Sequence, residues 1–355
     1  MSNSTFIDFG QPMTGILAIY SISIIIFGSL GNILILLTIS HKNYLLQYEN
    51  GRSVDSSFNS SIYIIKGIIC IKSCKRSELL LILLTYTDFI CLWILVLRYA
   101  IHLTTDQDIR TITLAGCLLH TYLSMVGSNL SVGLLGIFSV QRAIAIIWPM
   151  ISKKWLTRKC LYICMIITLL IILIKHLPVF ILLNIRQLAP SLYVCDINYK
   201  DDDNKTKFKY YYYIEFSTHI VLGYVILIIS NISLFICLNI QKRNKVANIT
   251  TGNDTTTTQK LNRIRYMNSA RLVLALSFYQ VISSIPFFVL VELPSVSGSQ
   301  IIPDKKRWLA YYITTLLLFT NNSYNFFITV YVSQHFRKST KLMLLHTWNS
   351  LKCKK

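Results

Sequence analysis

The chain has 355 residues, of which 53% are hydrophobic and only 14% are charged, yet its formal net charge is +20. A soluble domain carries about 25% charged residues, so this composition excludes a water-soluble enzyme, a disordered chain and a simple nucleic-acid-binding protein. It fits a membrane protein with several spans whose basic residues gather at one face.

Seven segments are apolar over a length that can cross a bilayer, which takes about 20 mostly apolar residues in a helix. They are 14–40, 79–100, 114–147, 160–184, 214–240, 270–293 and 308–332. A shorter apolar run at 61–71 contains Lys66, so we expect it at the membrane surface. The predicted fold class is all-α integral membrane, a seven-transmembrane helix bundle over 14–332 between an N-terminal segment, 1–13, and a tail, 333–355.

The distribution of charge sets the orientation of this bundle. The connecting segments on one side are 41–78, 141–159, 241–271 and 333–355, and they hold most of the 35 lysines and arginines. On the other side the basic and acidic residues balance. Since cytoplasmic loops are enriched in Lys and Arg, we expect the N-terminus outside and the C-terminus inside. Asn3 and Asn204 begin Asn-x-Thr/Ser sequences on the outer side and are predicted glycosylation sites.

The second span carries one acidic residue, Asp88, near its middle. A charge at this depth is costly in lipid, so Asp88 must face the inside of the bundle and find polar partners. The first, third and seventh spans offer Asn32, Ser131, Asn321, Asn322 and Asn325. Two interpretations stay open. Asp88, Ser131, Asn321 and Asn325 form either a sodium-like cation site or a structural hydrogen-bond network. No other cofactor is expected.

The third span begins at Cys117 and ends at Arg142. Their separation corresponds to about 37 Å of helix, so the two residues lie at opposite faces of the membrane. The other cysteine of an outer loop is Cys195, and a disulfide with Cys117 would hold that loop over the bundle. Two free thiols are the alternative. By charge alone, Arg142 is one more basic anchor at the inner face.

Short motifs stand in a fixed order along the spans. They are Gly31-Asn32, Leu84-Thr85-Tyr86-Thr87-Asp88, Cys117, Ser139-Val140-Gln141-Arg142-Ala143, Trp148-Pro149, Cys195, Pro286, Asn321-Asn322-Ser323-Tyr324-Asn325-Phe326-Phe327 and Phe336-Arg337-Lys338. Together they resemble rhodopsin-like, or class A, G-protein-coupled receptors over roughly residues 16–345. The last motif resembles the start of the family's short amphipathic eighth helix. The sequence from Asn325 is also similar to that of invertebrate FMRFamide-type neuropeptide receptors.

The chain departs from the family pattern in several motifs. Gln141 stands where the family has an acidic residue before the arginine. The sixth span has Ser-Ser-Ile before Pro286 instead of Cys-Trp-x-Pro, and the seventh has Thr329 where Asn-Pro-x-x-Tyr ends. In the family these motifs serve activation. The departures therefore leave open a divergent seven-helix receptor that binds a ligand but does not signal.

The resemblance also narrows the ligand. Receptors for amines have an Asp where this chain has Ser124, and opsins have a Lys where it has Phe319, so a peptide is favoured. The acidic residues of the outer face would attract a basic peptide. By position, the predicted pocket residues are Arg98, His120, Ser124, Phe287, Phe288, Glu292, Tyr311 and Thr315. Lys175 either joins them or extends outward to the membrane surface.

Three inner segments have unusual sequences. In the long first inner loop, 41–78, residues 51–72 are an insertion, a membrane-surface segment or a stretch from a mispredicted gene. The segment 241–269 is predicted to be a flexible third inner loop. The tail, 333–355, predicts an amphipathic helix on anionic inner-leaflet lipid, and Cys353 is a predicted palmitoylation site.

The resemblance therefore implies a multi-pass plasma-membrane receptor, not an enzyme. We expect an extracellular neuropeptide as ligand and a heterotrimeric G protein as the inner partner, contacted through Arg142. A proton- or ion-coupled transporter or channel that uses Asp88 as a relay is the second hypothesis, although the sequence shows no repeated halves. Nucleic acid is not an expected partner.

Overall fold

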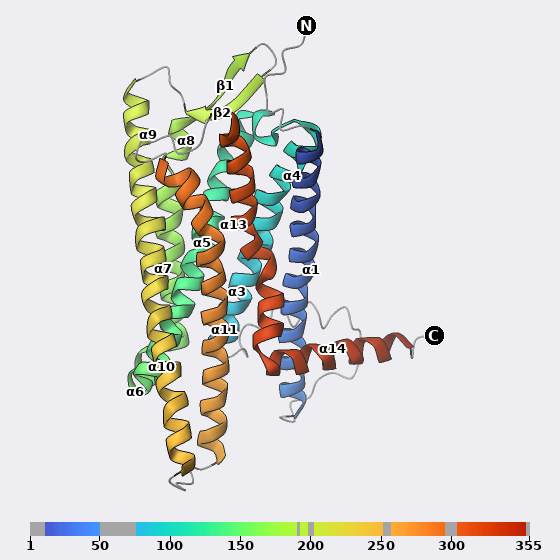
Figure 1. Ribbon diagram of the computed structural model, residues 1–355, viewed down its shortest axis with the longest axis vertical. Coiled ribbons are helices and arrows are strands. Elements are labelled where there is room, and N and C mark those ends of the chain that lie inside the picture. Colours follow the sequence, from blue (N-terminus) through green and yellow to red (C-terminus); the bar gives the residue numbers. More distant parts are fainter. Residues whose placement is uncertain are drawn as a thin grey trace.

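The computed structural model describes residues 11–49, 76–189, 192–197, 202–250, 257–294 and 304–352. In this part of the chain, long helices run side by side as one elongated bundle (Figure 1). A β-hairpin lies at one end of the bundle, and helix α14 crosses the other end. The predicted sites Asn3 and Cys353 and the segment 51–72 lie outside the described residues.

The bundle consists of helices that follow one another along the chain. The first half is α1 (Gln11–Glu49), α3 (Arg76–Cys91) with η2 (Leu92–Val96) and α4 (Leu97–Thr105), the short η3 (Ile109–Thr111), α5 (Leu114–Ile147) and α6 (Pro149–Trp155). The second half is α7 (Arg158–His176), α8 (Val179–Leu182), α9 (Asp202–Glu215) with η4 (Phe216–Gly223) and α10 (Tyr224–Thr250), α11 (Thr257–Phe287) with η5 (Phe288–Glu292), α13 (Asp304–Val332) and α14 (Gln334–Lys352). Where α3, α9 and α11 continue into η2, η4 and η5, the helix has π-helical hydrogen bonding.

Six of the helical stretches that the structure describes are long and apolar enough to cross a membrane. They are Met13–Lys42, Glu78–Thr105, Leu114–Ile147, Arg158–Leu182, Thr206–Ile240 and Met267–Glu292. The seventh predicted span lies in α13, which is not apolar enough to count among these six. It nevertheless packs between α1 and α11 in the bundle (Figure 1). It is less apolar because its middle is polar but buried, as Asn321, Asn322 and Asn325 show. A composition measure cannot distinguish a polar face turned inward from one turned toward lipid.

Several boundaries differ from the predicted ones. α1 reaches Glu49, α10 reaches Thr250 and α11 begins at Thr257, so the predicted inner loops contain more helix than expected. The fourth predicted span ends earlier, because the helix breaks at Leu177 and Pro178 and the last turn is α8. Proline has no backbone N–H and interrupts the helical hydrogen-bond pattern.

The bundle agrees with the predicted all-α membrane fold class, and one connecting segment adds a small β-hairpin that the sequence did not predict. Strand β1 (Leu183–Ala189) pairs antiparallel with β2 (Leu192–Ile197), and Ile185 lies opposite Cys195. Figure 1 shows this hairpin over one end of the bundle. Short strands in a connecting segment leave a weak pattern, and the predicted fourth span covered the start of β1.

Helices α1 and α13 approach each other unusually closely. A Cβ added at Gly28 would lie 2.6 Å from the Cβ of Ser323, and one at Gly31 would lie 2.9 Å from the Cβ of Phe326. Only glycine permits backbones to approach this closely. The contact places Asn32 Nδ2 where it donates to the backbone oxygen of Asn322 at 3.1 Å.

Helix α14 is fixed to α1 at one end of the bundle. The hydroxyl oxygens of Thr38 and Thr340 are 3.2 Å apart, and the ring centroids of His41 and His346 are 5.4 Å apart. Arg337 donates to the backbone oxygen of Tyr331 at 2.6 Å. The face of α14 turned away from α1 exposes the apolar residues Leu342, Leu345 and Trp348.

Candidate functional site

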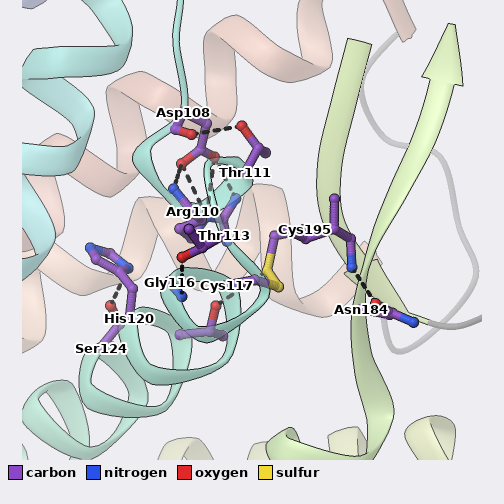
Figure 2. Close-up of a disulfide and its surroundings, with 12 residues drawn as sticks. Asp108, Arg110, Thr111, Thr113, Gly116, Cys117, His120, Ser124, Asn184 and Cys195 are labelled. Carbon is purple, nitrogen blue, oxygen red and sulfur yellow. Dashed lines mark hydrogen bonds and ion pairs between the residues drawn. A yellow bond between two sulfur atoms is a disulfide. The ribbon is translucent and has the colours of Figure 1, made fainter.

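The hairpin is tied to the bundle by a disulfide between Cys117 in the first turn of α5 and Cys195 on β2 (Figure 2). The hydroxyl of Thr113 caps α5 by accepting a hydrogen bond from Gly116 N at 3.0 Å. Cys117 itself is fully buried. The predicted pairing is confirmed, and it closes a loop of 78 residues in sequence.

Beside the disulfide, Asp108 bridges two arginines. Its carboxylate accepts hydrogen bonds from Arg98 at 3.0 and 2.8 Å and from Arg110 at 3.1 and 2.8 Å. Burial alone would raise the pKa of Asp108, but the bonds and charges of the two guanidinium groups hold it well below its usual range. Arg98, predicted to contact ligand, therefore already shares a carboxylate with Arg110, and Asp108 is not among the predicted site residues.

The predicted pocket residues separate into groups. His120 Nε2 is hydrogen-bonded to the backbone oxygen of Ile94 at 2.8 Å, and Ser124 Oγ lies 3.3 Å from His120 Nδ1. Figure 2 shows His120 and Ser124 on successive turns of α5. Through His120, this pair is bonded toward η2, to which Ile94 belongs.

A second group is aromatic. The hydroxyl of Tyr311 is 2.9 Å from that of Tyr99, and the rings of Phe287 and Tyr311 are 6.3 Å apart. Phe288 packs edge-on against Tyr224 at 4.7 Å, and Thr315 is buried. The structure thus brings Tyr311 and Phe287 together, and Arg98 lies 5.0 Å from the Tyr99 ring in the same region.

The carboxylate of Glu292 has a different environment. It accepts a hydrogen bond from the hydroxyl of Tyr212 on α9. Among the side chains that the structure describes, no lysine or arginine forms an ion pair with Glu292. Within the described part of the chain, the partner of the Glu292 carboxylate is thus a neutral hydroxyl and not a cation.

A cavity of about 100 Å³ lies next to the disulfide, between α5, α8, α9 and the hairpin. Its lining consists of Arg110, Thr121, Met125, Val179, Leu182, Leu183, Cys195, Asp196, Phe208 and Tyr211. None of the eight predicted pocket residues belongs to this lining. The sequence does not reveal this cavity because six of its ten lining residues come from the hairpin and from the short helices η3 and α8, which were not predicted as separate elements.

A partly buried ion pair connects three helices in the same half of the bundle. Lys175 Nζ on α7 lies 2.6 Å from Glu215 Oε2 on α9. Asn129 on α5 joins both, since it accepts from Lys175 at 2.7 Å and donates to Glu215 at 2.8 Å. Two interpretations of Lys175 are open from the sequence, a pocket residue or one that extends outward to the membrane surface. In the structure, its side chain points into the bundle. By the predicted spans, Lys175 lies inside the fourth and Glu215 at the outer end of the fifth, so their opposite charges are the signal in the sequence that points to the pair.

The cavity and the ion pair share a neighbour in Tyr211. Its hydroxyl donates to Met125 Sδ at 3.0 Å and is hydrogen-bonded to His176 Nδ1 at 2.7 Å. The other ring nitrogen of His176 lies 3.7 Å from the carboxylate of Glu215. His176 is completely buried. A continuous set of polar contacts therefore runs from the cavity wall to the ion pair.

In the middle of the bundle, Asp88 is wholly buried and bonded to two of its three predicted partners. Ser131 Oγ donates to Asp88 Oδ1 at 2.7 Å, and Asn325 Nδ2 donates to Asp88 Oδ2. Asn321 lies one turn earlier on α13 and is also buried, but its Oδ1 has no hydrogen-bond partner. The four polar side chains offer only oxygen atoms and amide groups, a donor set suited to a hard cation.

At the end of α5 opposite the disulfide, Arg142 is buried rather than exposed, with 5% of its surface accessible. Its guanidinium lies 5.5 Å from the ring centre of Phe138. Gln141 is equally buried, and its side-chain oxygen has no hydrogen-bond partner. The predicted contact residue for an inner partner is therefore covered in this conformation. Asn204, the other predicted modification site, lies in the first turn of α9.

One comparison with known proteins gives a match. Residues 62–328 match the family described as "7 transmembrane receptor (rhodopsin family)". The matched segment includes the disulfide, Asp88, Arg142 and the Lys175–Glu215 pair, and it amounts to well over half of the chain. No curated protein matches the chain.

Proposed function

Because the chain belongs to the rhodopsin family of seven-transmembrane receptors, we propose that it binds an extracellular peptide at the plasma membrane and activates a heterotrimeric G protein. The observation that supports this most is the arrangement along α5. One end of that helix is bonded to the hairpin through Cys117, and the other end carries the covered Arg142. A single rigid element thus joins a loop that can contact a ligand to a cation that can contact a partner.

The charges of the outer end favour a basic peptide. Arg98 and Arg110 share the single carboxylate of Asp108, and Glu215 is paired with Lys175. Among the described side chains, Glu292 is bonded by the hydroxyl of Tyr212 and by no lysine or arginine. A lysine or arginine side chain of the ligand would complete this site by forming an ion pair in a partly buried environment. The similarity of the Asn325 motif to neuropeptide receptors favours a neuropeptide.

Activation requires only that the ligand bind one state of the bundle better than the other. We propose that the two states differ in the positions of the inner parts of α10 and α11, and that outward movement of these parts uncovers Arg142. Gln141 cannot supply the negative charge that would hold Arg142 in the covered state. We therefore expect raised G-protein activation in the absence of ligand. The basic and apolar residues of α14 would rest on anionic inner-leaflet lipid.

Asp88, Ser131 and Asn325, with Asn321 one turn away, fit a bound sodium ion. The unpartnered Oδ1 of Asn321 supports this, because a buried amide oxygen without a hydrogen bond is costly and a cation would satisfy it. When bound, the ion would supply positive charge that stabilises the ionised carboxylate of Asp88. This chain's residues orient that carboxylate through the two hydrogen bonds described above.

A peptide-library screen tests the proposed function. Cells expressing the chain are exposed to the library while recruitment of an engineered mini-G protein is recorded, with Arg142→Ala as the matched control. Recruitment by at least one basic peptide, lost in the control and weakened in Glu292→Gln, is the expected result. Ligand binding without recruitment would identify a receptor that does not signal. Ion flux through purified protein in liposomes would instead support a transporter or channel.

A further inference from the structure

Two neighbouring tyrosines on α9 face different surroundings. Tyr212 bonds Glu292, whereas Tyr211 lines the cavity beside the disulfide. Successive residues of a helix point about 100° apart, so the cavity and the Glu292 carboxylate lie on adjacent sides of the same helix. We propose that this cavity is a second ligand subsite, which takes an uncharged branched aliphatic side chain of the peptide and reports its occupation through Tyr211. This inference rests on the proposed function and adds to it the chemical class of a second anchor.

The lining selects for an apolar group of limited size. Met125, Val179, Leu182, Leu183 and Phe208 supply hydrocarbon, and the disulfide forms another part of the wall. An engineered apolar cavity of about 150 Å³ accepts benzene, so about 100 Å³ suits a smaller branched aliphatic group.

The two charged residues of the lining do not favour a charged occupant. Arg110 already forms an ion pair with Asp108 at 2.8 Å, and Asp196 brings a negative charge to the same wall. The lining therefore carries one charge of each sign, so an ionised side chain would gain little and lose its hydration. The polar side chains of the lining are suited to hydrogen bonds with the peptide backbone that would carry the aliphatic group.

Tyr211 is placed to transmit occupation of the cavity. Its hydroxyl is held by Met125, which also lines the cavity, and by His176, which faces Glu215. Glu215 is the last residue of α9, and the π-helix η4 starts at the next residue and continues as α10. Short π-helical segments are frequent at functional sites. A group that displaces Tyr211 must rearrange the contacts that hold this junction, and α10 runs from there to the opposite end of the bundle (Figure 1).

A tethered probe tests the subsite without knowledge of the natural ligand. Val179 is 2% exposed and lines the cavity, whereas Ile181 on the same short helix is 77% exposed. Val179→Cys and the matched control Ile181→Cys are made in full-length chains whose other unpaired cysteines are replaced by serine. Both are treated with isobutyl methanethiosulfonate, or with the methyl reagent as a size control. Mass spectrometry measures modification, and mini-G-protein recruitment measures ligand-free signalling.

We expect the isobutyl reagent to modify Val179→Cys and to change ligand-free recruitment at least threefold relative to the methyl reagent. The change should be absent in Ile181→Cys and in Val179→Cys combined with Tyr211→Phe, which keeps the ring but loses the hydroxyl contacts. Where the unmodified protein recruits a G protein, modification without a change in recruitment would overturn the inference, as would an equal change in Ile181→Cys or in the Tyr211→Phe combination. Failure of the folded Val179→Cys protein to react would overturn it too, because the cavity would then be closed to ligand.

The thermal midpoint of the purified protein gives a readout that does not depend on signalling. An isobutyl group that fills the cavity should raise the midpoint of Val179→Cys by a few degrees over the methyl group, and an unchanged or lower midpoint would count against the subsite. If no variant recruits a G protein but the midpoint rises, the proposed function fails while the subsite stands.

Discussion

Lys175 and Glu215 lie 2.6 Å apart inside the bundle, although they come from different helices and from a region where charged residues are costly. Their side chains are only 13% and 16% exposed. Removing these two charges from water costs free energy. Each residue therefore depends on the opposite charge of the other to offset that cost.

Glu215→Gln should destabilise the protein by about 1–3 kcal/mol, because it leaves the partly buried ammonium of Lys175 without its counter-charge. The midpoint of thermal unfolding in detergent measures this. The double variant Lys175→Met, Glu215→Leu should recover most of the loss, since apolar side chains need no partner there. The exposed Lys159→Met is the control and should leave the midpoint unchanged. A double variant less stable than Glu215→Gln would show that the pair stabilises more than its desolvation costs.

Gln141→Asp should lower ligand-free G-protein recruitment by roughly fivefold. An aspartate beside Arg142 would add about 1 kcal/mol of interaction to the covered state, and that corresponds to this factor. Recruitment is compared at equal surface expression. Gln141→Met, which removes the amide but adds no charge, is the matched control and should not reduce recruitment. Unchanged activity in Gln141→Asp, or an equal fall in both variants, would contradict the explanation.

Asp88→Asn should abolish any dependence of stability on sodium. In the unaltered chain, replacing choline chloride with sodium chloride at equal ionic strength should raise the thermal midpoint, because the ion binds the folded state only. Asn cannot supply the negative charge, so the two salts should become equivalent. Thr320→Val, a buried change elsewhere on α13, serves as control and should keep the difference between salts. If the unaltered chain shows no difference, the cluster around Asp88 is a structural network.

Cys117→Ser should cost about 4 kcal/mol of stability, the loop-closure estimate for a bond that spans 78 residues. Peptide binding should fall at the same time, since the hairpin would no longer be held over the bundle. Surface expression, thermal midpoint and binding of the peptide found in the screen are the measurements. Cys237→Ser removes an unpaired thiol and should change none of them. Retained binding in Cys117→Ser would mean that the hairpin is positioned by its other contacts.

The pH dependence of stability should reflect Asp108. Its pKa is depressed in the folded protein, so its contribution is complete above the unfolded value of about 3.9 and is lost only as pH falls toward the folded value. Asp108→Asn should therefore destabilise the protein by the same amount at pH 5 and pH 8. Below about pH 4 the two proteins should converge. Thermal midpoints across this range test it, and a difference that grows on acidification would have the wrong sign.

The sequence predicted the positions of the helices well, because apolar runs and basic loops follow directly from the membrane as solvent. It also predicted the partner of Cys117, since few cysteines share the outer compartment. It did not predict that Asp108 would engage Arg98, or that Lys175 would engage Glu215. Those contacts depend on helix rotation and on the path of connecting segments, which hydropathy does not determine.

The predicted ligand pocket shows the same limit. The position of a residue along a span indicates its depth in the membrane but not the direction of its side chain. The sequence therefore predicts His120 and Ser124 as pocket residues, whereas in the structure His120 bonds toward η2 and Ser124 bonds His120. Tyr211, which lines the cavity, was not selected because the hairpin and α8 that complete the wall had no clear sequence signal. The Asp88 cluster was easier to find, because a carboxylate in mid-membrane requires polar neighbours wherever they lie in the sequence.

The close packing of α1 against α13 and the attachment of α14 to α1 have a practical consequence for measuring motion. Gly28, Gly31 and the Thr38–Thr340 contact make these three helices one body. A fluorophore on the exposed Lys341 of α14 therefore supplies a fixed reference frame at the end of the bundle where α10 and α11 project (Figure 1). A second fluorophore on either projecting helix would then report its displacement as a change in energy-transfer efficiency, free of any contribution from α14 itself.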